Sequence, residues 1–69
     1  ELTERESEIL EQIARGKTNA EIAANLNLSI KTVSNYISNV LLKVHATDRA
    51  KLMLMALEAG LGQKPTRSE

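Results

Sequence analysis

Only three residues, Asn27 to Ser29, separate two segments that carry strong helix signals, and this short connection constrains the fold most. The first segment opens with Thr18 and Glu21, a capping box in which the Thr hydroxyl and the Glu carboxylate each bond a free backbone N–H. Asn27 can end that helix because asparagine tolerates a positive φ, and Ser29 is a candidate N-cap for the next. Two helices joined so tightly, the second longer and polar on one side, are typical of a helix-turn-helix.

The longer second segment has two distinct faces. Its apolar positions follow helical spacing and form one stripe: Val33, Ile37, Val40, Leu41 and Val44. Its polar positions fall at i, i+3, i+4 and i+7 on the opposite face: Lys31, Ser34, Asn35 and Ser38. The first helix of the pair is expected to turn Ile22, Ala23 and Leu26 inward.

Two further helices are predicted on either side of this pair. Thr3 and Glu6 form a second capping box, followed by Ile9, Leu10 and Ile13 at helical spacing and by Gly16 as a left-handed cap. Thr47 or Asp48 opens the last helix, Arg49 to Ala59, which Gly60 ends. We therefore predict an all-α domain of four helices over residues 1–62, with residues 63–69 as a flexible C-terminal tail.

Composition excludes several classes of protein. A chain of 69 residues without cysteine and with the single histidine His45 has no metal-site pattern. It also lacks a nucleophile motif, paired carboxylates on a shared face and a phosphate-binding glycine loop, so we expect no enzyme, cofactor or small-molecule substrate. The longest apolar run, residues 52–57, is far too short to span a membrane, and no signal peptide is visible. We expect a cytoplasmic protein, and the first residue, Glu1, suggests a piece of a longer one.

Charge is distributed unevenly along the chain. The net charge is zero, which argues mildly against a nucleic-acid partner. Residues 1–28 carry a net charge of −3, however, and residues 29–51 carry +3. No carboxylate occurs from Ile22 through Thr47, and such a stretch suits a surface that meets phosphates.

The polar face of the third helix has the chemistry needed to read DNA. A major groove admits one α-helix, in which Asn can pair with adenine, Lys with guanine and Ser with either. Ser29, Lys31 and Thr32 lie at the helix N-terminus, where free N–H groups suit a phosphate, and Lys43 could reach a flanking phosphate. Periodicity alone supports an ordinary solvated face equally well. Arg49 is expected to be structural, because it opens the fourth helix.

The fourth helix is apolar all round from Leu52 to Leu57, so its second face needs a partner. One stripe holds Met53, Ala56 and Gly60. The other holds Ala50, Leu54, Leu57 and Leu61. Periodicity does not decide which stripe faces the core. We assign a two-fold dimer contact to the second stripe; scattered surface Met and Leu residues are the alternative.

The residues quoted so far resemble the LuxR/FixJ (NarL-like) family of helix-turn-helix domains, across residues 2 to 61. The resemblance is carried by Leu2-Thr3-x-Arg5-Glu6-x-Glu8-Ile9-Leu10, by residues 16–23, and above all by residues 28–40. It implies a DNA-binding effector domain of a bacterial two-component response regulator, with double-stranded DNA, a second copy and RNA polymerase as partners. It also implies that the fourth helix dimerises.

By position, the resemblance places four residues beside bases or nearby phosphates: Lys31, Ser34, Asn35 and Ser38. Thr32, Val33 and Lys43 match backbone-contact or apolar-contact places. Two residues depart from the family: Ser34 stands where Lys or Arg is frequent, and Tyr36 where His is frequent. The uncharged Ser34 and the zero net charge favour the alternative, a protein-interaction or dimerisation module that does not bind DNA.

Overall fold

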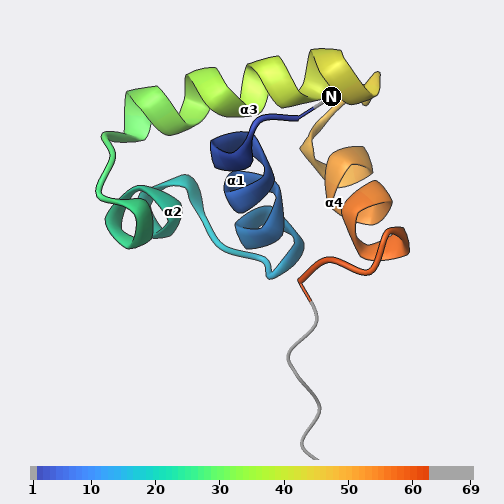
Figure 1. Cartoon of the computed structure of the whole chain (residues 1–69), viewed down its shortest axis with the longest axis horizontal. Helices are drawn as coiled ribbons and strands as arrows, with labels where there is room; N and C mark the ends of the chain where they lie inside the picture. The colour runs from blue at the N-terminus through green and yellow to red at the C-terminus, as the bar shows by residue number, and fades with distance from the viewer. Residues whose placement is uncertain (1, 63–69) are drawn as a thin grey trace, which may run out of the picture.

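The computed structural model describes residues 2–62, which form four α-helices (Figure 1). These are α1 (Glu4–Ala14), α2 (Asn19–Leu26), α3 (Ile30–Val44) and α4 (Arg49–Glu58). No strand occurs between residues 2 and 62, which confirms the all-α prediction. Within the same range, no helix is long and apolar enough to cross a membrane. The predicted tail, residues 63–69, lies outside the described residues.

Both predicted capping boxes are present at the N-termini of α1 and α2. Thr3 Oγ1 accepts from the Glu6 N–H at 3.1 Å, and Glu6 Oε1 accepts from the Thr3 N–H at 2.9 Å. Thr18 and Glu21 repeat this exchange at 3.1 and 2.8 Å. Ser29 caps α3, and Asp48 rather than Thr47 caps α4, each through a side-chain oxygen. All four helix starts therefore follow from local hydrogen bonds.

The helix ends use backbone in the left-handed region. Gly16 has φ +82° after α1, and Asn27 has φ +59° after α2, as predicted. The connection between α2 and α3 is residues 27–29, which confirms the tight turn. His45 also adopts a positive φ, +60°, and caps α3. The only histidine of the sequence thus lies just beyond the last residue of the helix.

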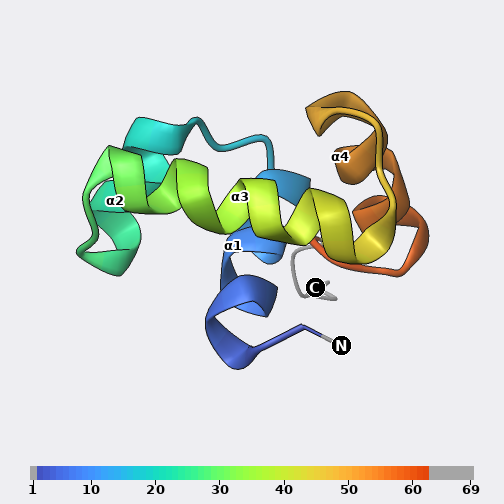
Figure 2. The same ribbon diagram turned by 90° about the horizontal axis from the view of Figure 1, so that it is seen from above.

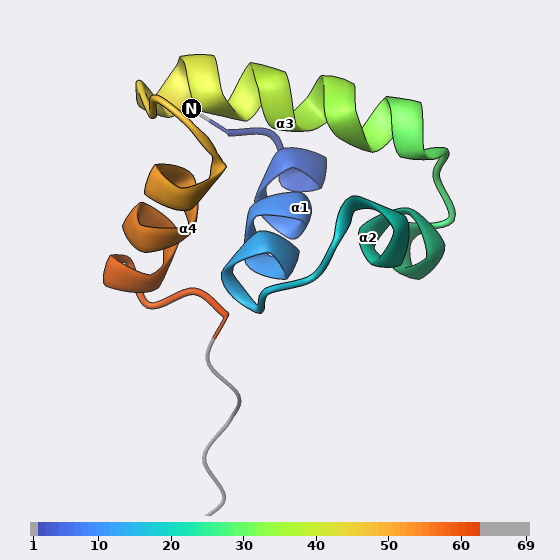
Figure 3. The same ribbon diagram turned by 180° about the vertical axis from the view of Figure 1, so that it is seen from behind.

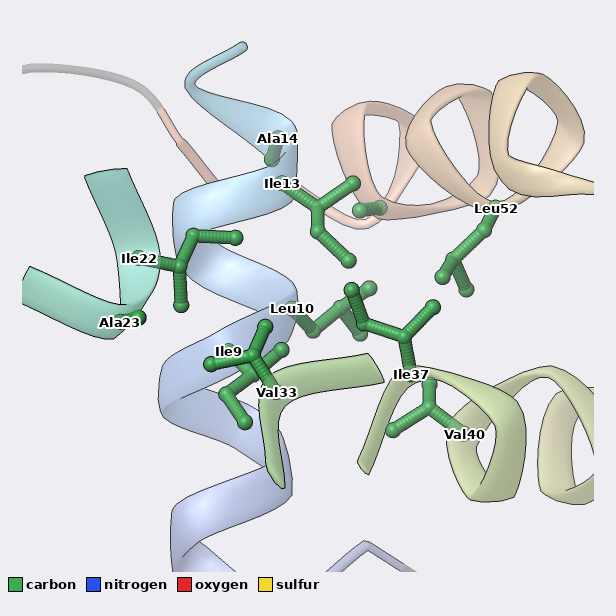
Figure 4. Packing of buried hydrophobic residues seen from close by; sticks show 11 residues of the cluster. Ile9, Leu10, Ile13, Ala14, Ile22, Ala23, Val33, Ile37, Val40 and Leu52 are labelled. Atoms are coloured by element: carbon green, nitrogen blue, oxygen red, sulfur yellow. The ribbon is translucent and has the colours of Figure 1, made fainter. Parts of the chain in front are cut away.

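The longest helix, α3, runs along one edge of the molecule, and the other three helices lie on the same side of it (Figures 1 and 3). Beneath it, α1 packs against each of the other helices. Side chains from all four helices meet in one core around Ile9 and Ile13 (Figure 4). Val33, Ile37 and Val40 of α3 are buried there, and Leu41 and Val44 pack at its margin, which confirms the apolar stripe. The opposite side of α3 is left outside the core.

The two faces of α4 are now distinguished. Leu52 and Ala56 are buried against the core, and Met53 packs beside them. Leu54 and Leu57 point away from the core and are 50% and 41% exposed. The stripe that contains Met53 and Ala56 is therefore the core-facing one.

After α4 the chain turns back onto the C-terminal end of α1. The Gly62 N–H donates to Glu11 Oε2 at 3.0 Å. Gly62 has φ +76°, and a Cβ placed on it would lie 2.6 Å from the Ala14 Cβ. Because no larger residue fits so close to Ala14, this glycine allows the return of the chain.

Candidate nucleic-acid interface

The outer face of α3 brings together the four polar residues that the sequence placed on one side. Lys31, Ser34, Asn35 and Ser38 are all exposed. Seen from this side, α3 crosses in front of the other helices (Figure 2). The same face continues to Leu42, which is 75% exposed and which the sequence analysis did not single out. We call these five residues the outer face of α3.

The N-terminal turn of α3 is closed by two hydroxyl groups. Ser29 Oγ accepts from the Thr32 N–H at 3.0 Å and donates to Thr32 Oγ1 at 2.8 Å. The Ser29 hydroxyl hydrogen is therefore used inside the cap. The Thr32 hydroxyl oxygen receives that bond in the first turn of α3.

Val33 does not belong to this surface. It has no exposed surface, because it lies on the apolar stripe of α3 with Ile37 and Val40. The expectation that Val33 contacts DNA is therefore wrong for this structure, since its side chain is enclosed by the core. We exclude it from the candidate interface.

Lys43 lies beside the N-terminus of α1 and pairs with a carboxylate there. Its Nζ donates to Glu6 Oε1 at 2.8 Å, and the Lys43 side chain is 38% exposed. Glu6 is the buried charged residue of the described chain, with 4% of its surface exposed. The Lys43 hydrogen bond, followed by that of the Thr3 N–H, lowers the pKa of Glu6 against the opposing effect of desolvation. Lys43 therefore ties α3 to α1, and its contact with a phosphate stays a prediction.

A side-chain network that the sequence analysis missed reaches Ser34. Arg49 donates to Asn19 Oδ1 at 2.6 Å and to the Lys17 carbonyl at 2.7 Å. Asn19 Nδ2 in turn donates to Ser34 Oγ at 3.2 Å. These bonds agree with the structural role expected of Arg49. No periodic signal could reveal them, because Arg49 and Asn19 are 30 residues apart.

The second predicted surface, on α4, is partly exposed. Ala50, Leu54 and Leu57 are exposed, whereas Leu61 is half-buried and packs against the core. Leu61 therefore belongs partly to the fold itself. Between residues 2 and 62, no group of three His, Cys, Asp or Glu side chains could hold a metal ion.

Comparison of the sequence with known proteins finds similarity to bacterial regulators. The GerE family model, described as "Bacterial regulatory proteins, luxR family", matches residues 1–56. The "Uncharacterized transcriptional regulatory protein YhcZ" of Bacillus subtilis is 46% identical over 61 residues, which are 88% of this chain and 28% of that protein. The "Response regulator protein VraR" of Staphylococcus aureus is 45% identical over 62 residues, which are 90% of this chain and 30% of that protein. The chain thus spans less than a third of the length of these curated relatives.

Proposed function

The chain belongs to the luxR family of bacterial regulatory proteins, which are DNA-binding transcription regulators, and from this premise we propose that it reads double-stranded DNA with the outer face of α3 in the major groove. The observation that carries this proposal is the position of α3 on one edge of the molecule, with its polar side chains exposed. A major groove about 12 Å wide accepts one helix of this kind.

The individual roles follow from side-chain chemistry. Asn35 can pair with adenine through two hydrogen bonds, and Lys31 can donate to guanine or to a phosphate. Ser38 and Ser34 can contact base edges or sugar-phosphate oxygens. Ser29 and Thr32 lie at the α3 N-terminus, where a phosphate would meet backbone N–H groups and the Thr32 hydroxyl. Lys43 is proposed to reach a flanking phosphate from its place beside Glu6.

We also propose that α4 joins two copies of the chain about a two-fold axis. Leu54 and Leu57 present apolar surface on the side of α4 away from the core, with Ala50 beside them. Two-fold symmetry makes such a patch self-complementary, and it would set two α3 helices about one turn of DNA apart, roughly 34 Å. Leu61 would border this contact from its half-buried position.

For the whole protein, we propose a two-component response regulator in which residues 1–62 form the DNA-binding effector domain. Relatives named as a response regulator and as a transcriptional regulatory protein support this assignment. A cytoplasmic location and an effect on RNA polymerase remain part of this proposal, as does the lack of an enzymatic activity.

A protein-interaction module that does not bind DNA is the second candidate. It is favoured by the ion pair of Lys43, which lowers the charge available to phosphates, and by a net charge of zero. This candidate predicts that the unmodified chain does not bind DNA and that Leu54→Lys abolishes its binding to a protein partner or to a second copy.

Selection from a pool of random duplexes separates the two candidates. We expect the folded chain to enrich an inverted repeat at low salt, with affinity falling steeply as salt rises. Enrichment of a single half-site would keep the DNA function and contradict the dimer. Absence of any enrichment at low salt, from a chain with a helical circular dichroism spectrum, would favour the interaction module.

A further inference from the structure

Arg49 links α4 to the outer face of α3 through α2, although α2 and α4 do not pack against each other. No Cα atom of α2 lies within 8 Å of a Cα atom of α4. The guanidinium of Arg49 nevertheless reaches Asn19, the first residue of α2, at 2.6 Å. Asn19 then reaches Ser34 on α3 at 3.2 Å. One amide side chain thus stands between the N-terminus of α4 and a residue of the outer face.

Arg49 determines the direction of both hydrogen bonds in the series Arg49–Asn19–Ser34. An arginine side chain has donors and no acceptor, so it must meet the oxygen of the Asn19 amide. The amide nitrogen of Asn19 is then turned towards Ser34, and the Ser34 oxygen can only accept from it. Ser34 is exposed, and its own hydroxyl hydrogen enters no hydrogen bond within residues 2–62. That hydrogen is left for an acceptor outside the protein.

We propose that Arg49 and Asn19 are positioning residues that orient the Ser34 hydroxyl as a hydrogen-bond donor towards DNA. This proposal rests on the proposed function, because it needs the outer face of α3 to meet a duplex. The acceptor is an oxygen or nitrogen of the duplex, either a phosphate oxygen or a base-edge atom such as purine N7. The orientation of Ser34 is set from α4, the helix that we assign to the dimer contact.

A double-mutant cycle tests the proposal. Arg49 and Ser34 do not touch each other, so energetic coupling between them indicates an effect carried by Asn19. Binding of the selected duplex is measured for the unmodified chain, Ser34→Ala, Arg49→Gln and the double variant. Loss of the Ser34 hydrogen bond is expected to weaken binding about 3- to 10-fold. If Arg49 acts through Ser34, the loss in the double variant is smaller than the product of the two single losses by about threefold or more.

The matched control is Arg15→Gln, which removes the same charge from an arginine that pairs with Glu11 on α1. The fold losses in affinity of Arg15→Gln and Ser34→Ala are expected to multiply in the double variant, because no side-chain hydrogen bonds within residues 2–62 connect Arg15 to Ser34. If Arg49→Gln does not fold by circular dichroism, Asn19→Ala takes its place in the cycle, with the same expected coupling. The acceptor is identified with duplexes that carry a single 7-deazapurine, which lacks the purine N7, or a single methylphosphonate, which replaces one phosphate oxygen. Ser34→Ala should no longer weaken binding to the duplex that lacks the acceptor of the Ser34 hydroxyl.

The outcomes separate this proposal from the proposed function. If the unmodified chain binds a duplex and the losses of Arg49→Gln and Ser34→Ala multiply, the positioning role is overturned and the DNA function stands. If the unmodified, folded chain binds no duplex, the proposed function is overturned and the positioning role with it. Coupling in the cycle without coupling in the Arg15 control supports both.

Discussion

The Lys43 ammonium lies 2.8 Å from Glu6 Oε1 and joins the C-terminal half of α3 to the first turn of α1. The same Glu6 oxygen accepts from the Thr3 N–H, so the capping box of α1 and the anchor of α3 share one carboxylate. Nearer the N-terminus of α3, Ser34 accepts a hydrogen bond from Asn19 at the start of α2. Two side-chain contacts, each between residues far apart in the sequence, thus hold α3 against α1 and α2.

Stability should fall in acid partly because of Glu6. Its pKa in the folded chain is lowered from 4.5, so its contribution is present above the unfolded value and is lost as pH falls through the folded one. We expect Glu6→Gln to lower the free energy of unfolding at pH 7. We also expect the free energy of unfolding to fall less between pH 6 and pH 3 in this variant than in the unmodified chain, as measured by urea unfolding at each pH. Glu8→Gln, at an exposed ion pair with Arg5, is the control. An unchanged pH dependence in Glu6→Gln would contradict the assignment.

Gly62→Ala should destabilise the return of the chain to α1. The new Cβ would meet Ala14 at 2.6 Å in addition to a φ of +76°, and we expect a loss of about 2–4 kcal/mol in urea unfolding. Gly60→Ala is the matched control, since it shares a positive φ of +89° but has nothing within 4 Å of the new Cβ. It should cost only about 1 kcal/mol. Equal losses would show that the contact with Ala14 is unimportant.

Lys31→Ala should weaken DNA binding, and its effect on the salt dependence shows whether Lys31 contacts a phosphate or a base. One phosphate contact fewer reduces the slope of log K against log salt by about 1, or leaves the slope unchanged and relaxes sequence preference if Lys31 contacts guanine. Binding isotherms at four salt concentrations distinguish the two. Lys51→Ala, at an exposed lysine on α4, is the control. If Lys31→Ala binds as tightly and specifically as the unmodified chain, the outer face has been assigned wrongly.

Leu54→Lys and Leu57→Lys should abolish self-association without unfolding the chain. Both side chains are about half exposed, so a charge there meets the partner copy rather than the core. Sedimentation of the chain without DNA, over a range of protein concentrations, measures the self-association. Leu42→Lys places the same change on a leucine that is 75% exposed on α3, and self-association should survive it. A dimer that persists in both α4 variants would refute the proposed contact.

The helices and their ends were predictable because their causes are local. Thr3 and Glu6, or Thr18 and Glu21, bond within one turn, and Asn27 ends α2 through its own backbone preference. The face that holds Asn35 followed from periodicity in the same way. Long-range pairs such as Lys43 with Glu6, or Arg49 with Asn19, depend on how the helices pack, and a single sequence carries no spacing rule for them.

The assignment of Val33 was wrong, and the roles of the α4 stripes and of Ser34 were left incomplete. Val33 was assigned to DNA by its position in the resemblance, although its place on the apolar stripe already pointed to the core, where it lies. The two stripes of α4 could be separated only once the structure showed Leu52 and Ala56 buried in the core that the four helices share. Ser34 was treated as a lost cation, whereas the structure makes it the end of the Arg49–Asn19 chain.

The central claim is that the outer face of α3 reads bases. The most direct test is a set of parallel duplex selections with the unmodified chain, Asn35→Ala and Asn25→Ala. Asn35 is exposed on that face, and Asn25 is an exposed asparagine on α2 bonded to Gln12. We predict that the unmodified chain and Asn25→Ala enrich the same sequence, whereas Asn35→Ala loses its preference at one base pair of each half-site. A full and unchanged preference in Asn35→Ala would contradict the account.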